Sequence, residues 1–302
     1  MIVILVSLEL LFRGIPNEYT FKKDYLDLHS NEIETLILGN SHNYYGLNPA
    51  YFNDYNTFNA AFTVQRTYFD LEILKKYEKN FEHLTTVILP IVPMELFFKP
   101  IQETSVVFNP SIHKYRIYYD LEIPFVYGDY FEISSKIFRL RSMSRTIISY
   151  YFEDKDQVKC SELGWGTNYN WQNSNDLEGT GRITAKQHDF IAYGLNEQSK
   201  GIEYNTGILE SIIEWCNERN INLLLYTPPV YESYRRGVDS SREEIAFDIL
   251  HDLALKYDNC TYESFYDDTN FMEKDFFDAD HLSDLGAEKL SKMMDERVHN
   301  LN

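Results

Sequence analysis

The chain is poor in cysteine and in positive charge. Its three cysteines, Cys160, Cys216 and Cys260, are odd in number and form no Cys-x-x-Cys pair. This argues against a disulfide scaffold, although one bridge stays open, and we expect Cys216 and Cys260 to be small core residues. Only 28 Lys and Arg stand against 47 Asp and Glu, and the resulting net charge of −19 repels phosphate backbones. We therefore expect no nucleic-acid partner.

Internal repeats and low-complexity tracts are also missing. The N-terminal segment from Met1 to Phe12 is apolar except for Ser7 and Glu9. As a helix it would span only about 18 Å, against a hydrocarbon core of about 30 Å. No basic segment precedes it, and no small-residue cleavage site is clear. Two interpretations stay open: the tail end of a membrane anchor, which would bring membrane association, or a packed helix.

The sequence does contain enough hydrophobic residues to form a large core. Its 302 residues are 44% hydrophobic and 16% aromatic. This is enough for one large α/β domain with an insertion, or for two small domains. We predict a lead-in or anchor remnant over residues 1–30, with no regular element in 14–33, and a domain over 31–302.

Strand and helix patterns alternate along much of that domain. Glu34 to Leu38 and Thr86 to Ile91 read as buried strands, and apolar residues at helical spacing between Val64 and Tyr77 predict a helix. This order is typical of a βαβ unit. From about residue 207 the pattern resumes with a helix through Ile208 and Cys216, a strand Ile221–Tyr226, a helix Ile245–Tyr257, a strand Cys260–Phe265 and a helix Ala287–Leu301.

Between about residues 97 and 206 the strand and helix patterns no longer alternate, and the sequence is rich in aromatic residues. We interpret it as an insertion or lid over the edge of the sheet. It contains Trp165, which is either a platform for a sugar ring or a packing residue of the insertion. The fold class that follows is α/β, with a mostly parallel sheet and a large aromatic-rich insertion.

A nucleophile candidate follows the first strand, in the run Gly39-Asn40-Ser41-His42. Ligands of doubly wound sheets bind beyond the carboxyl ends of the strands, which is where Ser41 stands. Gly39 allows a sharp turn, and the Ser41 amide is placed to meet a developing oxyanion. His42 diverges from its neighbour, so it binds substrate or holds the loop. An ordinary polar turn is the alternative.

The acid–base candidate is Asp278-x-x-His281, just before the last helix. A serine hydroxyl needs a histidine to take its proton, and a carboxylate orients that histidine. The side chain of Asp280 is expected to point away from that of Asp278, so we predict Asp278 as the partner of His281. An acidic loop that caps the last helix, with Ser283 or Asp284 as the cap, is the alternative. The carboxylates nearby show no ordered ligand spacing, so we predict no metal and no cofactor.

These segments together resemble the SGNH/GDSL hydrolase superfamily. Leu36 to His42 is similar to its first block, in the G-[DNS]-S form, and Asp278 to Leu282 to its last block. Asn59-Ala60-Ala61 is similar to the start of the second block. The run from Tyr44 to Pro49 also resembles a bacterial subgroup of uncharacterised, often membrane-anchored members.

The resemblance implies a flavodoxin-like three-layer α/β/α sandwich and ester chemistry on acylated glycans or lipids. It implies Ser41, His281 and Asp278 as the catalytic residues, with Asn59 at the second block. The subgroup implies an anchor and so the extracytoplasmic face of a bacterial membrane, the cytoplasm being the alternative.

Two departures from the family pattern bear on activity. Val64 stands where the second block has an oxyanion-hole glycine, and the third block, G-x-N-D, is absent after Val87-Ile88-Leu89. One oxyanion donor is worth about 10²–10³ in rate, so we expect another donor, such as Asn40, to replace it. Two hypotheses follow: a serine esterase or O-acyltransferase acting on acyl, foremost acetyl, esters of a carbohydrate or surface polysaccharide, or an inactive glycan-binding or scaffold protein of polysaccharide biosynthesis.

Overall fold

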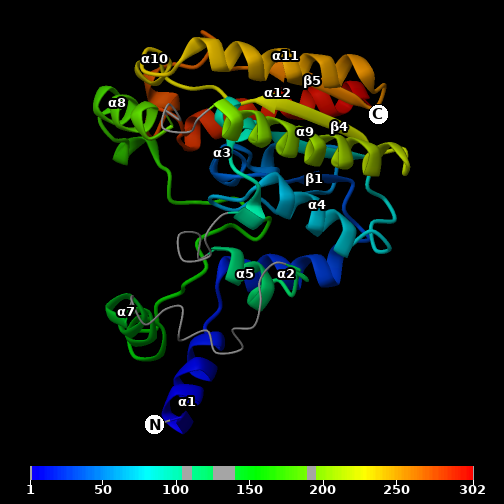
Figure 1. Cartoon of the computed structure of the whole chain (residues 1–302). Coiled ribbons are helices and arrows are strands. Elements are labelled where there is room, and N and C mark those ends of the chain that lie inside the picture. The colour runs from blue at the N-terminus through cyan, green and yellow to red at the C-terminus, as the bar shows by residue number, and fades with distance from the viewer. Residues whose placement is uncertain (1, 104–110, 125–139, 189–194, 302) are drawn as a thin grey trace. The chain divides into compact units, whose positions relative to one another are not determined.

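The structure, a computed structural model, describes residues 2–103, 111–124, 140–188 and 195–301 (Figure 1). The chain divides into two compact units, one of residues 1–28 and 102–160 and the other of residues 29–101 and 161–302. The first unit thus joins the N-terminal 28 residues to part of the region after β3. The predicted boundary at residue 30 and the predicted insertion over 97–206 stay predictions.

The larger unit contains a five-stranded sheet in the order β2-β1-β3-β4-β5, with every neighbouring pair parallel. Its strands are β1 (Thr35–Ile37), β2 (Thr57–Asn59), β3 (Thr86–Pro90), β4 (Asn222–Thr227) and β5 (Cys260–Ser264). This is the flavodoxin-like strand order, in which the direction of winding reverses between β1 and β3.

The strands are continuous apolar runs because both faces of the sheet are covered. Ile37, Ile88 and Leu224 lie side by side in register on β1, β3 and β4. They belong to one buried cluster with Leu290 and Met294 of the C-terminal helix α12 (Asp284–Leu301). That helix was predicted from its apolar spacing, and it closes one face of the sheet.

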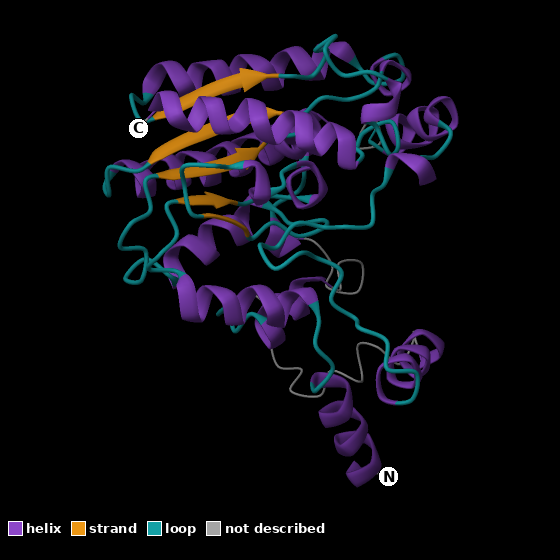
Figure 2. Ribbon diagram, turned by 180° about the vertical axis from the view of Figure 1, so that it is seen from behind, coloured by secondary structure: helices purple, strands orange, loops and turns teal. Residues whose placement is uncertain are grey.

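Helices lie on both faces of the sheet, as Figures 1 and 2 show. Helix α4 packs beside α9, α11 packs on β5, and α12 packs on α3. The further helices of this unit are α3 (Ser41–Gly46), α4 (Thr67–Lys76), α8 (Leu177–Gln187), α9 (Leu195–Asn217), α10 (Glu232–Arg235) and α11 (Ser240–Lys256), with short 3₁₀ turns at Pro49–Tyr51, Pro93–Phe97, Trp171–Asn173 and Glu273–Asp275. The predicted three-layer α/β/α sandwich is confirmed.

The smaller unit is built from helices. They are α1 (Ile2–Arg13), α2 (Glu18–His29), α5 (Ser111–Tyr118) and α7 (Leu140–Tyr151), with a 3₁₀ turn Ile101–Glu103 at its border. The prediction that 14–33 holds no element is wrong, because α2 occupies it. Its buried face carries Tyr19, Lys22 and Leu26, and a lysine on that face hides the apolar pattern.

Helix α1 leaves much of its apolar surface open. The side chains of Val3, Ile4 and Leu10 are 77%, 64% and 65% exposed. Tyr151 of α7 donates a hydrogen bond to the carbonyl of Leu11, 2.8 Å away. Among the described residues, no helix combines the length and the apolar character that crossing a bilayer requires.

Candidate active site

The turn after β1 is shaped by a glycine that no other residue can replace without strain. Gly39 has a φ of +106°, and a Cβ placed on it would lie 2.3 Å from Cδ of Pro90 in β3. Its backbone N–H donates to the buried Asp70 carboxylate at 2.7 Å. Asn40 then caps α3 by accepting from the N–H of His42 at 2.8 Å. As a result Ser41 opens a helix at the carboxyl edge of the sheet, beside the point where winding reverses.

Ser41, His281 and Asp278 form one hydrogen-bonded chain. Ser41 Oγ lies 2.8 Å from His281 Nε2, and His281 Nδ1 lies 2.9 Å from an oxygen of Asp278. The same Asp278 oxygen accepts from the backbone N–H groups of Asp280 and His281, at 3.1 and 2.9 Å. These bonds fix the carboxylate in the loop before α12. The two remote segments that the sequence analysis paired thus lie at one site in the structure.

Aromatic rings enclose the imidazole of His281. His42 stacks on it, with ring centroids 4.8 Å apart and an interplanar angle of 18°. Tyr45 and Tyr169 approach it edge-on, at 6.3 and 5.6 Å. His42 thus forms part of the wall of the site, and the imidazole bonded to the Ser41 oxygen is that of His281.

The charges around His281 favour its protonated form. Burial lowers its pKa, but the charge of Asp280 and the bond and charge of Asp278 outweigh this and raise the pKa to about 9. Burial raises the pKa of Asp278 too, but its bond to His281 prevails and lowers it to about 2. The prediction that Asp280 points away is wrong: an oxygen of Asp280 lies 3.5 Å from His281 Nδ1, because the tight turn brings both carboxylates to one side.

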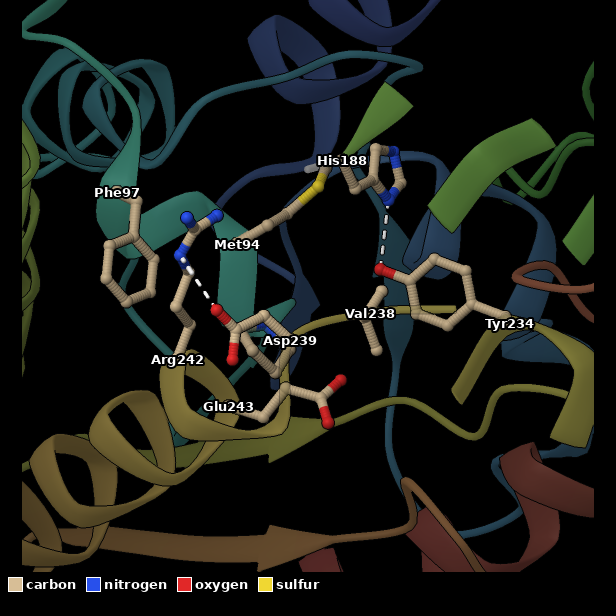
Figure 3. Close-up of a pocket in the computed structure, with 9 residues that line it drawn as sticks. Met94, Phe97, His188, Tyr234, Val238, Asp239, Arg242 and Glu243 are labelled. Carbon is tan, nitrogen blue, oxygen red and sulfur yellow. Dashed lines mark hydrogen bonds and ion pairs between the residues drawn. The ribbon is translucent and has the colours of Figure 1, made fainter. Parts of the chain in front are cut away.

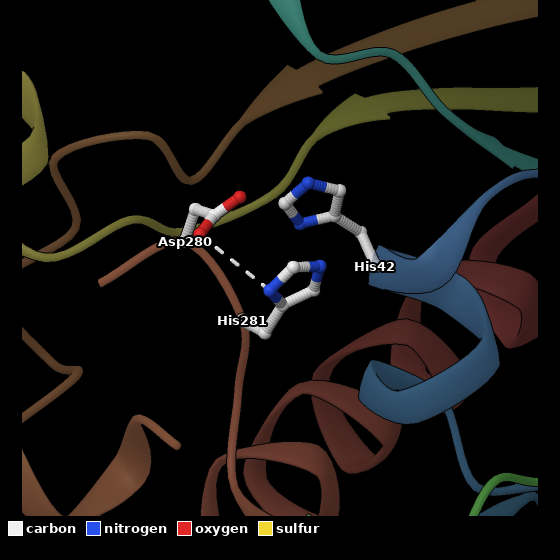
Figure 4. A group of neighbouring side chains, drawn as sticks. All are labelled: His42, Asp280 and His281. Carbon is white, nitrogen blue, oxygen red and sulfur yellow. Dashed lines mark ion pairs between the residues drawn. The ribbon is translucent and has the colours of Figure 1, made fainter. Parts of the chain in front are cut away.

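His42, Asp280 and His281 are also the group that comes nearest to a metal site among the described residues. Their ligand atoms lie within 4.8 Å of one another, and Figure 4 shows the two rings facing each other with Asp280 beside them. However, both ring nitrogens of His281 are already bonded, to Ser41 and to Asp278. A metal ion here would have to displace one of these bonds.

A cavity of about 200 Å³ opens over Ser41. Three loops that follow β1, β2 and β3 supply most of its wall. The lining residues are Asn40, Ser41, His42, Val64, Gln65, Arg66, Val92, Met94, Glu95, Phe98, His188, Asp280 and His281. The predicted binding residues Asn40, His42 and Val64 are thus in place.

Three N–H groups on residues that line this cavity have no acceptor within the described part of the chain. Two of them are the backbone N–H groups of Ser41 and Val64. Val64 has a φ of +61°, in the left-handed region that glycine adopts most freely. The third donor is the Asn40 amide, which gives one of its two N–H bonds to Glu95 at 2.8 Å and keeps the other.

Glu95 follows β3, where the resembled family carries its third block. Its oxygens accept from Nδ2 of Asn40 at 2.8 Å and from the backbone N–H of Val92 at 3.3 Å. Burial raises the pKa of Glu95 to about 7, although these two bonds and the charge of Arg66 oppose the shift. Glu95 therefore fixes which side of the Asn40 amide faces the cavity.

Two predicted binding residues lie outside the cavity wall. Asn59 is fully buried, and its amide donates to the carbonyls of Asn43 and Leu47 at 2.7 and 2.8 Å. Trp165 donates its indole N–H to the carbonyl of Tyr45 at 2.7 Å. These bonds hold the loop after β1. They leave no free amide N–H on Asn59, whereas the proposed stacking of a sugar ring on Trp165 stays a prediction.

His188 joins this cavity to a smaller one of about 30 Å³, drawn in Figure 3. Met94 and His188 line both. Nδ1 of His188 lies 2.9 Å from the hydroxyl of Tyr234. Burial, and then the charge of His281, lower the pKa of His188 to about 4, so this imidazole is neutral near pH 7.

Sequence reasoning missed Arg66, Glu95 and His188. The one usable signal was the position of Glu95, just beyond a buried strand that pairs with β1. Arg66 precedes a predicted helix, and His188 lies in the region that was interpreted as an insertion. Neither residue carries a motif.

No protein-family model matches the chain, and no curated protein matches it. A solved structure described as "The structure of a putative platelet activating factor from Streptococcus pneumonia" matches at 13% identity and a TM-score of 0.46. The match covers 93% of this chain and 91% of that chain. A similarity at this level assigns neither a family nor an activity to this chain.

Proposed function

We propose that this protein is a serine esterase or O-acyltransferase of the SGNH/GDSL type. One observation carries the proposal: Ser41 Oγ lies 2.8 Å from His281 Nε2, and the other nitrogen of that ring lies 2.9 Å from Asp278. This is the geometry in which an imidazole takes the proton of a serine and a carboxylate stabilises the imidazolium. The order of the motifs and the position of Ser41 at the reversal of the sheet support the family.

In the proposed reaction, Ser41 Oγ bonds to the acyl carbon of an ester while its proton passes to His281 Nε2. The N–H groups of Ser41, Val64 and Asn40 stabilise the oxyanion. The intermediate then breaks its bond to the leaving alkoxide, which takes the proton from Nε2. Water or an acceptor hydroxyl gives its proton to Nε2 and attacks the acyl-enzyme, which restores Ser41 and releases an acid or a new ester.

We propose that the acyl group is short, foremost acetyl. The cavity over Ser41 measures about 200 Å³ and has room for an acetyl ester. Acetyl esters of a carbohydrate or surface polysaccharide are the proposed substrates. We retain this substrate class, and an extracytoplasmic membrane location through the segment before residue 30, as parts of the proposal that await experiment.

Turnover of 4-nitrophenyl acetate and of an O-acetylated polysaccharide tests the activity. We expect the purified protein to release acetate, and Ser41→Ala and His281→Ala to lose at least about 10³ in kcat. A control variant, Ser211→Ala, removes an exposed hydroxyl that is bonded to the carbonyl of Gly207 within α9, outside both cavities, and should keep full activity. A folded wild-type protein that turns over neither ester but binds the polysaccharide would favour the alternative, an inactive glycan-binding protein.

A further inference from the structure

A half-buried arginine lies in the wall of the cavity over Ser41. Arg66 follows β2 and directly precedes α4. Its Nη2 donates to the carbonyl of Lys99 at 3.0 Å and to the side chain of Asn205 at 3.2 Å. Its guanidinium carbon lies 4.7 Å from the centre of the Phe98 ring. The hydrogen bonds of Nη2 and the contact with Phe98 hold one edge of the guanidinium, and this fixes the position of Nε and Nη1.

The positive charge of Arg66 has no ion-pair partner among the described residues, although the chain has 47 acidic side chains. Its Nε and Nη1 have no hydrogen-bond acceptor in that part of the chain either. Neither nitrogen is sealed from the cavity or solvent, because neither is among the buried polar atoms that lack a partner. A cation withdrawn from water without a counter-charge is costly, and a bound anion offsets that cost.

The acid that acts most strongly on Arg66 is Glu95, and it does not pair with it. Burial lowers the pKa of Arg66, and the charge of Glu95 opposes that shift. The oxygens of Glu95 accept instead from Asn40 and from the backbone of Val92. Glu95 forms no ion pair with Arg66 in the described part of the chain. Arg66 therefore keeps donors for a group that enters the same cavity as the nucleophile.

We propose that Arg66 is an anion-binding subsite, so that the substrate is an ester with a carboxylate or a phosphate-type anion close to its reacting carbonyl. This inference rests on the proposed esterase or acyltransferase function. Arginine suits this role because its planar donors match the paired oxygens of carboxylates and phosphates. The clamp on Nη2 leaves Nε and Nη1 to meet these oxygens.

Three esters separate the two places where the anion can sit. 4-Nitrophenyl acetate is neutral, mono-(4-nitrophenyl) succinate carries the anion on the acyl side, and 4-acetoxybenzoate carries it on the alcohol side. The ratio of kcat/KM between wild type and Arg66→Gln cancels the intrinsic reactivity of each ester. We expect this ratio to be about tenfold or more for at least one anionic ester and close to one for the neutral ester. The anionic ester that loses more identifies the side.

Two variants control for charge and for folding. Arg182→Gln removes an exposed positive charge from α8, outside the cavity wall, and should leave all three ratios near one. Arg66→Lys keeps the charge but loses the paired donors, so a several-fold loss confined to an anionic ester is expected. If Arg66→Gln does not fold, Arg66→Lys decides. Equal losses on neutral and anionic esters, or none, would overturn the subsite.

A binding measurement separates this proposal from the catalytic one. Succinate titrated calorimetrically into Ser41→Ala should bind, and the affinity should fall about tenfold or more when Arg66→Gln is added. Binding that depends on Arg66 in a protein that turns over no ester would retain the anion site and remove the esterase. Ester turnover without any dependence on Arg66 would retain the esterase and remove the anion site.

Discussion

Asp280 holds a carboxylate oxygen 3.5 Å from Nδ1 of His281, next to the shorter 2.9 Å bond from Asp278. The imidazole therefore faces two acidic groups, of which only one is its close hydrogen-bond partner. Asp280 contributes mainly through its charge, which helps to raise the pKa of His281 to about 9 against the opposing effect of burial.

This arrangement predicts a basic pH optimum. A general base must be neutral, so kcat/KM should rise with pH up to about 9, the value for His281. Asp280→Asn removes a charge that favours the imidazolium, so the pH range over which kcat/KM rises (the rising limb of the profile) should move to lower pH. A pH–rate profile from pH 5.5 to 10 measures the shift, and Asp267→Asn, at an exposed position, should leave the limb in place. An unchanged limb in Asp280→Asn would refute this role.

A second prediction concerns the strained backbone of Val64. A β-branched residue at a φ of +61° is costly, and the side chain is 65% exposed, so little burial offsets the cost. Val64→Gly should be more stable than Val64→Ala by about 1 kcal/mol, since only glycine adopts this conformation freely. Both variants keep the backbone N–H, so both should retain kcat within a few-fold.

Thermal and denaturant unfolding of the two Val64 variants gives the stability difference, and the esterase assay gives kcat. Val64→Ala equal to or more stable than Val64→Gly would contradict the strain. A loss of kcat in both variants would mean that the side chain itself takes part.

A third prediction assigns the replacement for the missing third block. Asn40→Ser keeps an oxygen that can cap α3 but removes the side-chain amide, whose second N–H is the proposed oxyanion donor. We expect kcat to fall by about 10²–10³ with little change in KM, as for the loss of one oxyanion donor. Asn40→Ala should show the same loss of kcat and a lower melting temperature. A wild-type kcat in Asn40→Ser would exclude Asn40 as a donor.

The sheet was largely readable from the sequence because its central strands are unbroken apolar runs. β3 and β4 appeared within one residue or so of their predicted limits. β2 was missed because it is only three residues long, Thr57–Asn59, and three residues show no period. Helix α2 was missed because its buried face includes Lys22, which looks like a solvent residue in one dimension.

The nucleophile and its partners were readable because their residue types and their order follow a chemical need. Arg66 and Glu95 were not, because charged residues are usually exposed and only the meeting of the loops after β2 and β3 places them at Ser41. Asn59 was expected at the site only through its place in the second block, and in the structure its amide donates to the backbone carbonyls of Asn43 and Leu47.

Covalent labelling tests most directly whether Ser41 is an activated nucleophile. A fluorophosphonate forms a bond to a serine oxygen and expels fluoride only where a base withdraws the serine proton. Intact-mass and peptide mass spectrometry should find one adduct on the wild-type protein, on Ser41, absent from Ser41→Ala and formed far more slowly on His281→Ala. A folded wild-type protein that gains no adduct, or an adduct that persists in Ser41→Ala, would contradict the account.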